Sequence, residues 1–310
     1  MISIVLIVAL LAGTSAFIPT SLHSSKISTT KLYRGSIDDI PSGFRRRADG
    51  KVVKSGSHPE EYVLENDNGA RAIVRTFGGN LFSWIPAGGE EVMGRRADAV
   101  PVDQDEDGVA YAGGAPHCFP QFGPGKLMQH GFARGMTFIP EERAKKVSFD
   151  RMIFKLLPTE ETLREWNHNF EYRFDVTLRE NSMEWDIIII NLDDKPFDCT
   201  LGLHNYYDVS SLKNVVIDGP MGKIKIDSPI DERFKGVSGP VTITDSGKGT
   251  RLTLESKGYD DLAIWNPYGD NSKGFDNFVC VEPVCLDPVT IPVGKFKETK
   301  FYHKVTYERI

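Results

Sequence analysis

The sequence has little cysteine and no excess of positive charge. Its 310 residues include four cysteines, and no two of them form a CxxC pair. A zinc knuckle, a redox dithiol or a disulfide framework is therefore not indicated, and we expect four free thiols, at Cys118, Cys199, Cys280 and Cys285. Lysine and arginine number 37 against 43 aspartate and glutamate residues, which gives a formal net charge of −6. Because nucleic-acid partners select a basic surface, this balance argues against them.

Apolar runs long enough to span a membrane are also missing. The run from Ile2 to Ala12 is about half the ~20 residues that a membrane helix needs. It suits the core of a signal peptide that ends at Ala16, although no basic residue precedes it. The segment 17–35 then contains seven serine or threonine residues, three basic residues and no acid, which is typical of a transit peptide.

This two-part N-terminus indicates a destination for the protein. A signal peptide (1–16) followed by a transit-like segment (17–35), with Phe17 just after the junction, resembles the bipartite plastid leader of algae with secondary plastids. We therefore expect the mature protein in the plastid stroma, with simple secretion as the alternative. The polar residues 36–58 are expected to form a linker. We expect a monomer with no membrane partner once the leader is removed.

The rest of the chain, 59–310, is typical of β-structure. Apolar and polar residues alternate over 172–178 and, after a turn, over 183–189, which predicts a hairpin with one wet face. The apolar run 187–190 indicates burial on both faces, and alternation over 301–307 predicts a closing strand. No helical pattern exceeds three turns and no repeat occurs. The sequence therefore predicts one all-β domain, a large antiparallel β-sandwich.

One segment rich in glycine and proline concentrates polar side chains. It reads GGAPHCFPQFGP from Gly113, followed by QHGFAR, so that Gln129, His130 and Arg134 lie within six residues. Such a segment suits a rigid loop that binds a polar ligand. Neither GxGxxG nor a GK[ST] sequence follows, which excludes a phosphate loop. The alternative is a buried loop whose histidines satisfy backbone carbonyls.

Two further residues stand out because their surroundings are apolar. His204 follows an apolar stretch, and Glu282 lies in the apolar run 278–283. A buried carboxylate is costly unless it is paired or functional. Pro283 is expected to end the strand and leave Glu282 at its mouth. A core histidine and a structural salt bridge are the alternatives. No second acid in a comparable setting suggests a glycosidase, so a His/Glu pair indicates acid–base proton transfer.

A metal site is the other chemistry that the histidines suggest. His117, His130 and His204 could form a three-histidine site. The sequence has none of the tight HxH or HExxH spacings that would make this specific. We therefore expect no metal.

Taken in order, five motifs resemble those of one family. GG-x-P-x-C-F-P-Q-F-G, Q-H-G-F-A-R, L-H-x-Y, W-N-P and V-C-V-E are similar to the motifs of the glucose-6-phosphate 1-epimerase group of the aldose 1-epimerase (mutarotase) superfamily. The resemblance implies a galactose-mutarotase-like β-supersandwich without a cofactor, and a small-molecule sugar phosphate as partner. The implied reaction is interconversion of the α and β anomers of an aldohexose 6-phosphate.

The same resemblance implies roles for individual residues. His204 would be the general acid and Glu282 the general base. Four residues would bind the substrate: Gln129, His130, Arg134 and Asp231. Ala112, however, stands where many members have an arginine that helps to hold the phosphate, and Arg95 and Arg96 are the candidate replacements. A mutarotase for unphosphorylated hexoses and a non-catalytic carbohydrate-binding module on the same fold therefore stay open.

Overall fold

The computed structural model describes residues 44–46, 52–54, 60–99, 111–294 and 296–310. The leader segments 1–16 and 17–35 lie outside the described residues, as does most of the linker. Within 36–58 the chain forms two short strands, β1 (Phe44–Arg46) and β2 (Val52–Lys54), which pair antiparallel.

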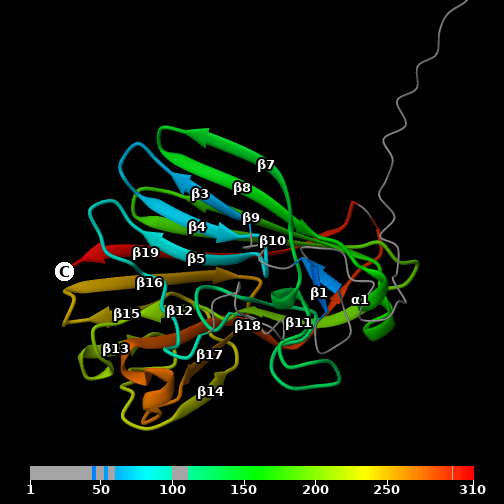
Figure 1. Ribbon diagram of the computed structural model, residues 1–310. Helices are drawn as coiled ribbons and strands as arrows, with labels where there is room; N and C mark the ends of the chain where they lie inside the picture. The colour runs from blue at the N-terminus through cyan, green and yellow to red at the C-terminus, as the bar shows by residue number, and fades with distance from the viewer. Residues whose placement is uncertain (1–43, 47–51, 55–59, 100–110, 295) are drawn as a thin grey trace, which may run out of the picture. The chain divides into compact units, whose positions relative to one another are not determined.

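Most of the described chain forms antiparallel sheets (Figure 1). The largest sheet has eight strands, in the order β13 (Val215–Asp218), β15 (Val241–Asp245), β16 (Thr250–Lys257), β19 (Glu298–Arg309), β10 (Ser182–Asn191), β9 (Phe170–Leu178), β8 (Phe149–Leu156) and β7 (Ile139–Lys146). A three-stranded sheet contains β3 (Glu61–Glu65), β4 (Arg71–Arg75) and β5 (Asn80–Ile85).

A six-stranded sheet forms the second large layer. Its order is β14 (Ile230–Phe234), β17 (Asp261–Asn266), β18 (Phe278–Ile291), β11 (Phe197–Leu203) and β6 (His117–Cys118), and β12 (Tyr206–Asp208) pairs with β18 beside β11. Helical turns are short: α1 (Glu160–Glu165), η2 (Ala133–Gly135), η3 (Leu212–Asn214), η4 (Asn271–Lys273) and η5 (Phe275–Asn277). The prediction of an all-β sandwich is confirmed. No helix in the described ranges has the length and apolar character to cross a membrane.

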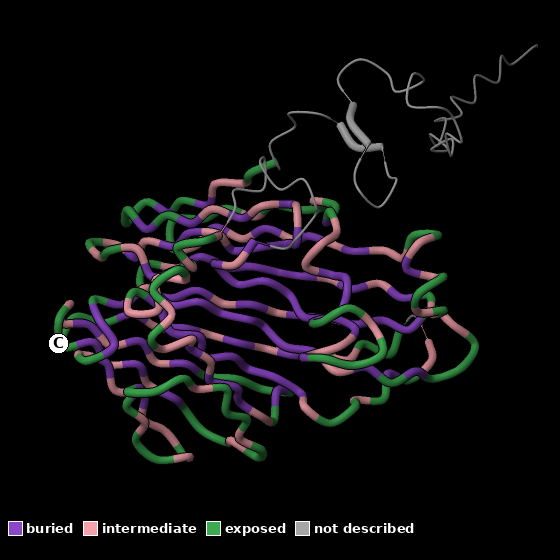
Figure 2. The backbone as a smooth tube through the Cα atoms, turned by 60° about the horizontal axis from the view of Figure 1, so that its bottom comes forward, coloured by how far each residue is buried: buried purple, intermediate pink, exposed green. Residues whose placement is uncertain are grey.

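The main core lies between the eight-stranded and the six-stranded sheets. Phe174 and Trp185 from the first sheet, and Leu201, Ile264 and Val281 from the second, belong to one apolar cluster. Figure 2 shows long buried stretches through the middle of the fold and exposed residues mainly in the connections. Because side chains alternate along a strand, every second residue of the six-stranded sheet faces away from this core.

The predicted hairpin and closing strand are confirmed, but the expected wet face is not fully exposed, because Asp175 and Thr177 are buried. β9 pairs with β10 in the register Met183↔Leu178, and β19 pairs with the other edge of β10. Burial on both faces of the isoleucine run holds only in part, because Ile188 is half-buried opposite Lys300 and Arg173. The four cysteines are free and buried, as expected.

The expectation that Pro283 ends its strand is wrong, because β18 continues to Ile291. The N–H of Val281 donates to the carbonyl of Asn205 (3.3 Å). Two residues further on, the nitrogen of Pro283 faces the same neighbouring segment, opposite Leu203, but proline has no N–H to donate. The Leu203 carbonyl instead accepts the N–H of Asn205 (2.9 Å). This three-residue turn is centred on His204. Pro283 therefore fits the sheet where β11 gives way to the turn.

Candidate active site

The strand register aligns a row of side chains across the six-stranded sheet. Arg233 of β14 pairs with Ala263 of β17, which pairs with Glu282 of β18. Residues directly opposite each other in antiparallel strands project from the same face. Ala263 in the middle of the row has only a methyl group and is buried.

His204 extends this row on the far side of β18. Its neighbours Gly202 and Tyr206 pair with Val284 and Cys280, so position 204 lies opposite Glu282. His204 Nδ1 is 3.5 Å from Glu282 Oε1. The two residues that the sequence singled out as a His/Glu pair are therefore neighbours.

The face that carries this row, called here the outer face, is turned away from the main core. Leu203, Ile264 and Val281 alternate with the row and belong to the main core. A separate small apolar cluster lies on the outer face: Tyr206, Phe278 and Cys280, with Trp265 packed against them. The His204 ring stacks on Tyr206, with 4.9 Å between ring centroids. This cluster supports the His204 ring from one side.

Burial dominates the electrostatics of the His/Glu pair. Glu282 is 2 % exposed, and burial raises its pKa well above the usual value, with Asp231 adding to the rise and Arg233 opposing it. Burial lowers the pKa of His204 well below its usual value, assisted by His130 and Arg134. Both shifts favour the neutral forms of the two groups over the doubly charged arrangement. Such a pair can give a proton to one substrate atom and take one from another.

His130 is held over the outer face by an unusual backbone conformation. Its φ is 67°, and it is the one non-glycine residue with positive φ in the described part of the chain. The next residue must be glycine, because a Cβ at Gly131 would lie 2.3 Å from the Phe119 carbonyl oxygen. The N–H of Gly123 donates to His130 Nδ1 (3.2 Å), which places the ring proton on Nε2. The His130 ring centroid is 5.1 Å from that of His204.

Backbone strain of this kind costs about 1–3 kcal/mol and is concentrated at functional sites. Burial, with the charges of Arg134 and Arg233, lowers the pKa of His130 to about 4. His130 is therefore neutral at pH 7 and offers an N–H donor next to His204.

Arg134 lies beside the histidines, while the Gln129 side chain is exposed. Arg134 is half-buried, and its Nη2 donates to the carbonyl of Gln129 (2.7 Å). Its charge lowers the pKa of both His130 and His204. The structure thus connects Gln129 to the site through its backbone.

Arg95 and Arg96 are placed differently. The Arg96 charge contributes to the lowered pKa of His204, and its Nε donates to Asp98 (2.7 Å). The Arg96 N–H donates to the carbonyl of Ala112 (2.9 Å). Arg95 is exposed, and its backbone forms a bridge with Gly113. Neighbours in an extended segment point to opposite sides, so Arg96 rather than Arg95 faces the histidine side.

Asp231 lies near the edge of the site. It projects from the same side of β14 as Arg233, and Arg233 Nη2 is 3.2 Å from Asp231 Oδ1. Their side chains are 61 % and 42 % exposed, so this ion pair is accessible to a ligand. Sequence reasoning missed Arg233. Its spacing of two residues from Asp231 was a signal that both share a face, but the partner strands could not be read from the sequence.

His117 is separated from the other histidines by the sheet. Its Nδ1 is 2.8 Å from Tyr172 Oη, and its Nε2 is 3.1 Å from the Gly79 carbonyl oxygen. It therefore faces the main core, whereas His130 and His204 lie on the outer face. A three-histidine metal site is not formed. His117 lies in β6 and satisfies a backbone carbonyl, as the alternative interpretation expected.

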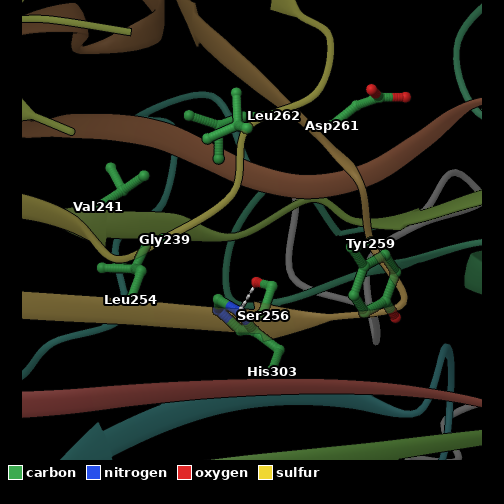
Figure 3. A pocket seen from close by; sticks show the side chains of 9 residues that line it. Gly239, Val241, Leu254, Ser256, Tyr259, Asp261, Leu262 and His303 are labelled. Carbon is green, nitrogen blue, oxygen red and sulfur yellow. Dashed lines mark hydrogen bonds between the residues drawn. The ribbon is translucent and has the colours of Figure 1, made fainter. Parts of the chain in front are cut away.

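A small cavity of about 20 Å³ lies near the turn between β16 and β17. Figure 3 shows the side chains around it, including Ser256, whose Oγ is 2.9 Å from His303 Nδ1. Such a volume holds about one water molecule. It is too small for a sugar, so the row on the outer face is the better candidate site.

Comparison with known proteins identifies the family. Residues 60–221 match the Aldose 1-epimerase family. The chain belongs to the aldose 1-epimerase family. It is therefore an enzyme of the mutarotase type with a small-molecule sugar as its partner.

Two relatives and two solved structures illustrate the similarity. Proteins named "Putative glucose-6-phosphate 1-epimerase" from Cenchrus ciliaris and Salmonella typhimurium are 28 % and 30 % identical to this chain. The alignments cover 83 % and 77 % of this chain and 86 % and 85 % of the relatives. A Salmonella typhimurium structure described as a "putative mutarotase" has a TM-score of 0.70 at 23 % identity, covering 80 % of this chain and 90 % of that one. The Slr1438 protein of Synechocystis sp. PCC 6803 has a TM-score of 0.69 at 20 % identity, covering 84 % and 99 %. The two structures share the galactose-mutarotase-like fold.

Proposed function

We propose that this protein interconverts the α and β anomers of an aldohexose 6-phosphate, with glucose 6-phosphate as the first candidate. The observation that carries the proposal is the buried His204–Glu282 pair, 3.5 Å apart, with arginines beside it. The names of the two relatives support the choice of a sugar phosphate.

The proposed reaction needs only proton transfers. The reacting form carries the shared proton on His204: Glu282, acting as general base, removes the proton from O1 of the sugar while His204, acting as general acid, protonates the ring oxygen. The ring opens, the C1–C2 bond rotates, and closure on the other face of C1 returns both protons. After ring opening the proton is on Glu282, so the two residues exchange roles in the reverse direction. Each positioned acid or base contributes about 10²–10⁴-fold.

The remaining groups would orient the sugar. His130 offers its Nε2–H to a hydroxyl group, and the exposed carboxylate of Asp231 can accept a hydrogen bond from another. Gln129, whose side chain is exposed next to Arg134, is the third candidate for a hydroxyl contact.

Arginines supply the charge that a phosphate needs. A phosphate ester carries about two negative charges near pH 7, and the planar guanidinium binds it through two parallel hydrogen bonds. Arg96, Arg134 and Arg233 all act on the pKa values of His130, His204 or Glu282. Arg96 is bonded through its backbone to Ala112, the position at which the family resemblance implies an arginine. We therefore propose Arg96 as the replacement.

One observation favours unphosphorylated hexoses as the alternative substrate. Arg96 is paired with Asp98, and Arg233 with Asp231, so two of the three arginines already have a carboxylate partner. A phosphate would have to compete with these carboxylates.

Anomer exchange measured by NMR on glucose 6-phosphate, glucose and galactose tests the proposal. We expect the purified protein to accelerate exchange of glucose 6-phosphate most. Arg96→Ala should weaken glucose 6-phosphate binding by roughly 10–150-fold, the equivalent of a lost charged hydrogen bond, and leave glucose nearly unchanged.

Arg95→Ala is the matched control, since it removes the same charge from the adjacent residue that faces away. If Arg96→Ala prefers glucose 6-phosphate over glucose to the same degree as the wild type does, Arg96 does not bind the phosphate. Faster exchange of free glucose than of glucose 6-phosphate by the wild type would reject the phosphorylated substrate.

A further inference from the structure

Three chemically different metal-ligand atoms meet on the outer face. A ring nitrogen of His204, the Sγ of Cys280 and a carboxylate oxygen of Glu282 all lie within 4.8 Å of one another. Cys280 and Glu282 are two residues apart on β18 and so share a face. The turn between β11 and β12 supplies His204, and all three residues are buried.

Two polar atoms of this cluster have no hydrogen-bond partner. His204 Nδ1 and Glu282 Oε2 are both buried, and neither makes a hydrogen bond within the described structure. Leaving a buried polar atom unpaired is costly, and more so for a carboxylate that is 2 % exposed. A small cation bound by His204 Nδ1 and by both carboxylate oxygens of Glu282 would satisfy the two atoms at once, which a hydrophobic ligand would not.

We propose that His204, Cys280 and Glu282 bind a soft divalent cation, with Zn²⁺ as the best match, and that the bound ion blocks the catalytic pair. Imidazole, thiolate and carboxylate are the ligands that zinc takes from proteins, whereas magnesium and calcium prefer oxygen alone. Three protein ligands would leave a fourth, open position on the ion. The thiol and carboxyl protons pass to solvent as the metal binds, and the two negative charges balance the ion.

The geometry requires only small side-chain shifts. Zinc bonds of about 2.0–2.3 Å in a tetrahedral site place neighbouring ligand atoms about 3.3–3.8 Å apart. His204 Nδ1 and Glu282 Oε1 are already 3.5 Å apart. Cys280 Sγ, at up to 4.8 Å, has to approach by about 1 Å, which a rotation about its χ1 can supply.

The consequence is mutual exclusion of metal and sugar. The atoms that would coordinate zinc are the ones that the proposed reaction uses for proton transfer. The inhibition therefore rests on the proposed function, while the metal site itself rests only on the cluster. A protein with this site would be active only where free zinc is kept low.

Cobalt serves as a spectroscopic probe for the site. Co²⁺ titrated into the purified protein should give the near-ultraviolet charge-transfer absorption of a thiolate ligand, together with the intense visible bands of four-coordinate cobalt. Cys280→Ser should remove the thiolate absorption. Cys285→Ser is the matched control, because Cys285 lies on the same strand but donates to the Gly258 carbonyl (3.3 Å) on the core side.

Zinc inhibition of anomer exchange gives the second readout. The measured quantity is the zinc inhibition constant of each variant divided by that of the wild type. We expect Cys280→Ser to weaken zinc inhibition at least about 10-fold, because even partners outside the ligand shell are worth 10–100-fold in affinity. Zinc should inhibit Cys285→Ser as strongly as it inhibits the wild type. Circular dichroism checks the folding of both, and Cys280→Ala replaces Cys280→Ser if the latter does not fold.

The outcomes separate the two proposals. A thiolate–cobalt absorption in wild type that Cys280→Ser lacks supports the site even if no sugar phosphate reacts. No such absorption, or the same absorption in Cys280→Ser, overturns the site. Zinc inhibition that is equal in wild type and Cys280→Ser shows that the ion acts elsewhere.

Discussion

Glu282 is held where water solvates its charge poorly, and this has a cost in stability. Its pKa is raised above the ordinary value of 4.5, so the folded protein binds this proton more tightly than the unfolded chain does. The folded state therefore loses stability as the pH rises from about 4.5 through the raised pKa, where the carboxyl group ionises. A group that is buried for its chemistry is expected to show this trade-off between stability and activity.

Glu282→Gln should separate the two effects. The amide keeps the shape of the side chain and removes the base, so kcat should fall at least about 10²-fold. The variant should also be more stable than the wild type, by an amount that grows as the pH rises above about 4.5, the ordinary pKa of the carboxyl group. Urea unfolding across this range, with anomer exchange as the activity assay, measures both.

Glu232→Gln provides the control for this comparison. Glu232 is an exposed carboxylate on β14. Its replacement should therefore change neither the pH dependence of the free energy of unfolding nor kcat. Wild-type kcat in Glu282→Gln would show that Glu282 is not the base. Equal stability of wild type and Glu282→Gln at every pH would show that burial of this carboxyl group carries no cost.

Among the elements, β18 and the turn beside it decide the position of His204. The N–H that Pro283 lacks would compete for the Leu203 carbonyl, which the Asn205 N–H now occupies (2.9 Å). With that competition absent, the turn can place the His204 ring opposite Glu282. We therefore expect this proline, which lies inside a strand rather than at a sheet edge, to help position His204.

Pro283→Val tests this role of the strand. The new N–H is expected to bond to Leu203, shift the turn and displace His204. Because a misplacement of about 1 Å can cost up to 10²-fold, we expect kcat to fall about 10-fold, with a smaller change in KM.

Pro288→Val is the control, since Pro288 is an exposed residue of the same strand, beyond the turn. Unchanged kcat in Pro283→Val, measured on protein whose circular dichroism matches the wild type, would show that the turn does not depend on the proline. A drop of the same size in Pro288→Val would indicate a general effect on β18.

For the whole molecule, the charge near the candidate site is opposite in sign to the net charge. The net charge of −6 disfavours an anionic ligand in general, whereas Arg96, Arg134 and Arg233 gather around one pair of catalytic candidates. At physiological ionic strength fields are screened over about 8 Å, so the local arginines outweigh distant acids for a ligand at the site.

Localisation is a second property of the whole chain, and we propose plastid import from the composition of the leader. Residues 1–34 fused to a fluorescent protein should enter the plastid of an alga with a secondary plastid. Phe17→Ala should divert the fusion to an outer compartment, and microscopy distinguishes the two. Secretion of the unaltered fusion, or import that ignores Phe17, would contradict the bipartite leader.

The sequence by itself determined the structural class and the catalytic candidates. Alternation over 172–178 and 183–189 is a local property with a period of two, so it predicted β9, β10 and their hairpin directly. His204 and Glu282 stood out because a titratable residue in an apolar stretch is costly, and the ordered motifs identified the family. These signals need no knowledge of which strands are neighbours.

Only the tertiary structure decided which groups meet. Arg233 lies in the row with Glu282 because β14 pairs with β17 in one particular register. His117 does not lie near His204, because the two side chains project from opposite faces of the sheet. Alternation states that two residues share a face, but the identity of the adjacent strand depends on pairing between segments far apart in the chain. The choice of Arg96 over Arg95, and the place of Pro283 inside β18, follow from such long-range hydrogen bonds. Long-range pairing is set by burial of the whole sheet, which no local pattern encodes.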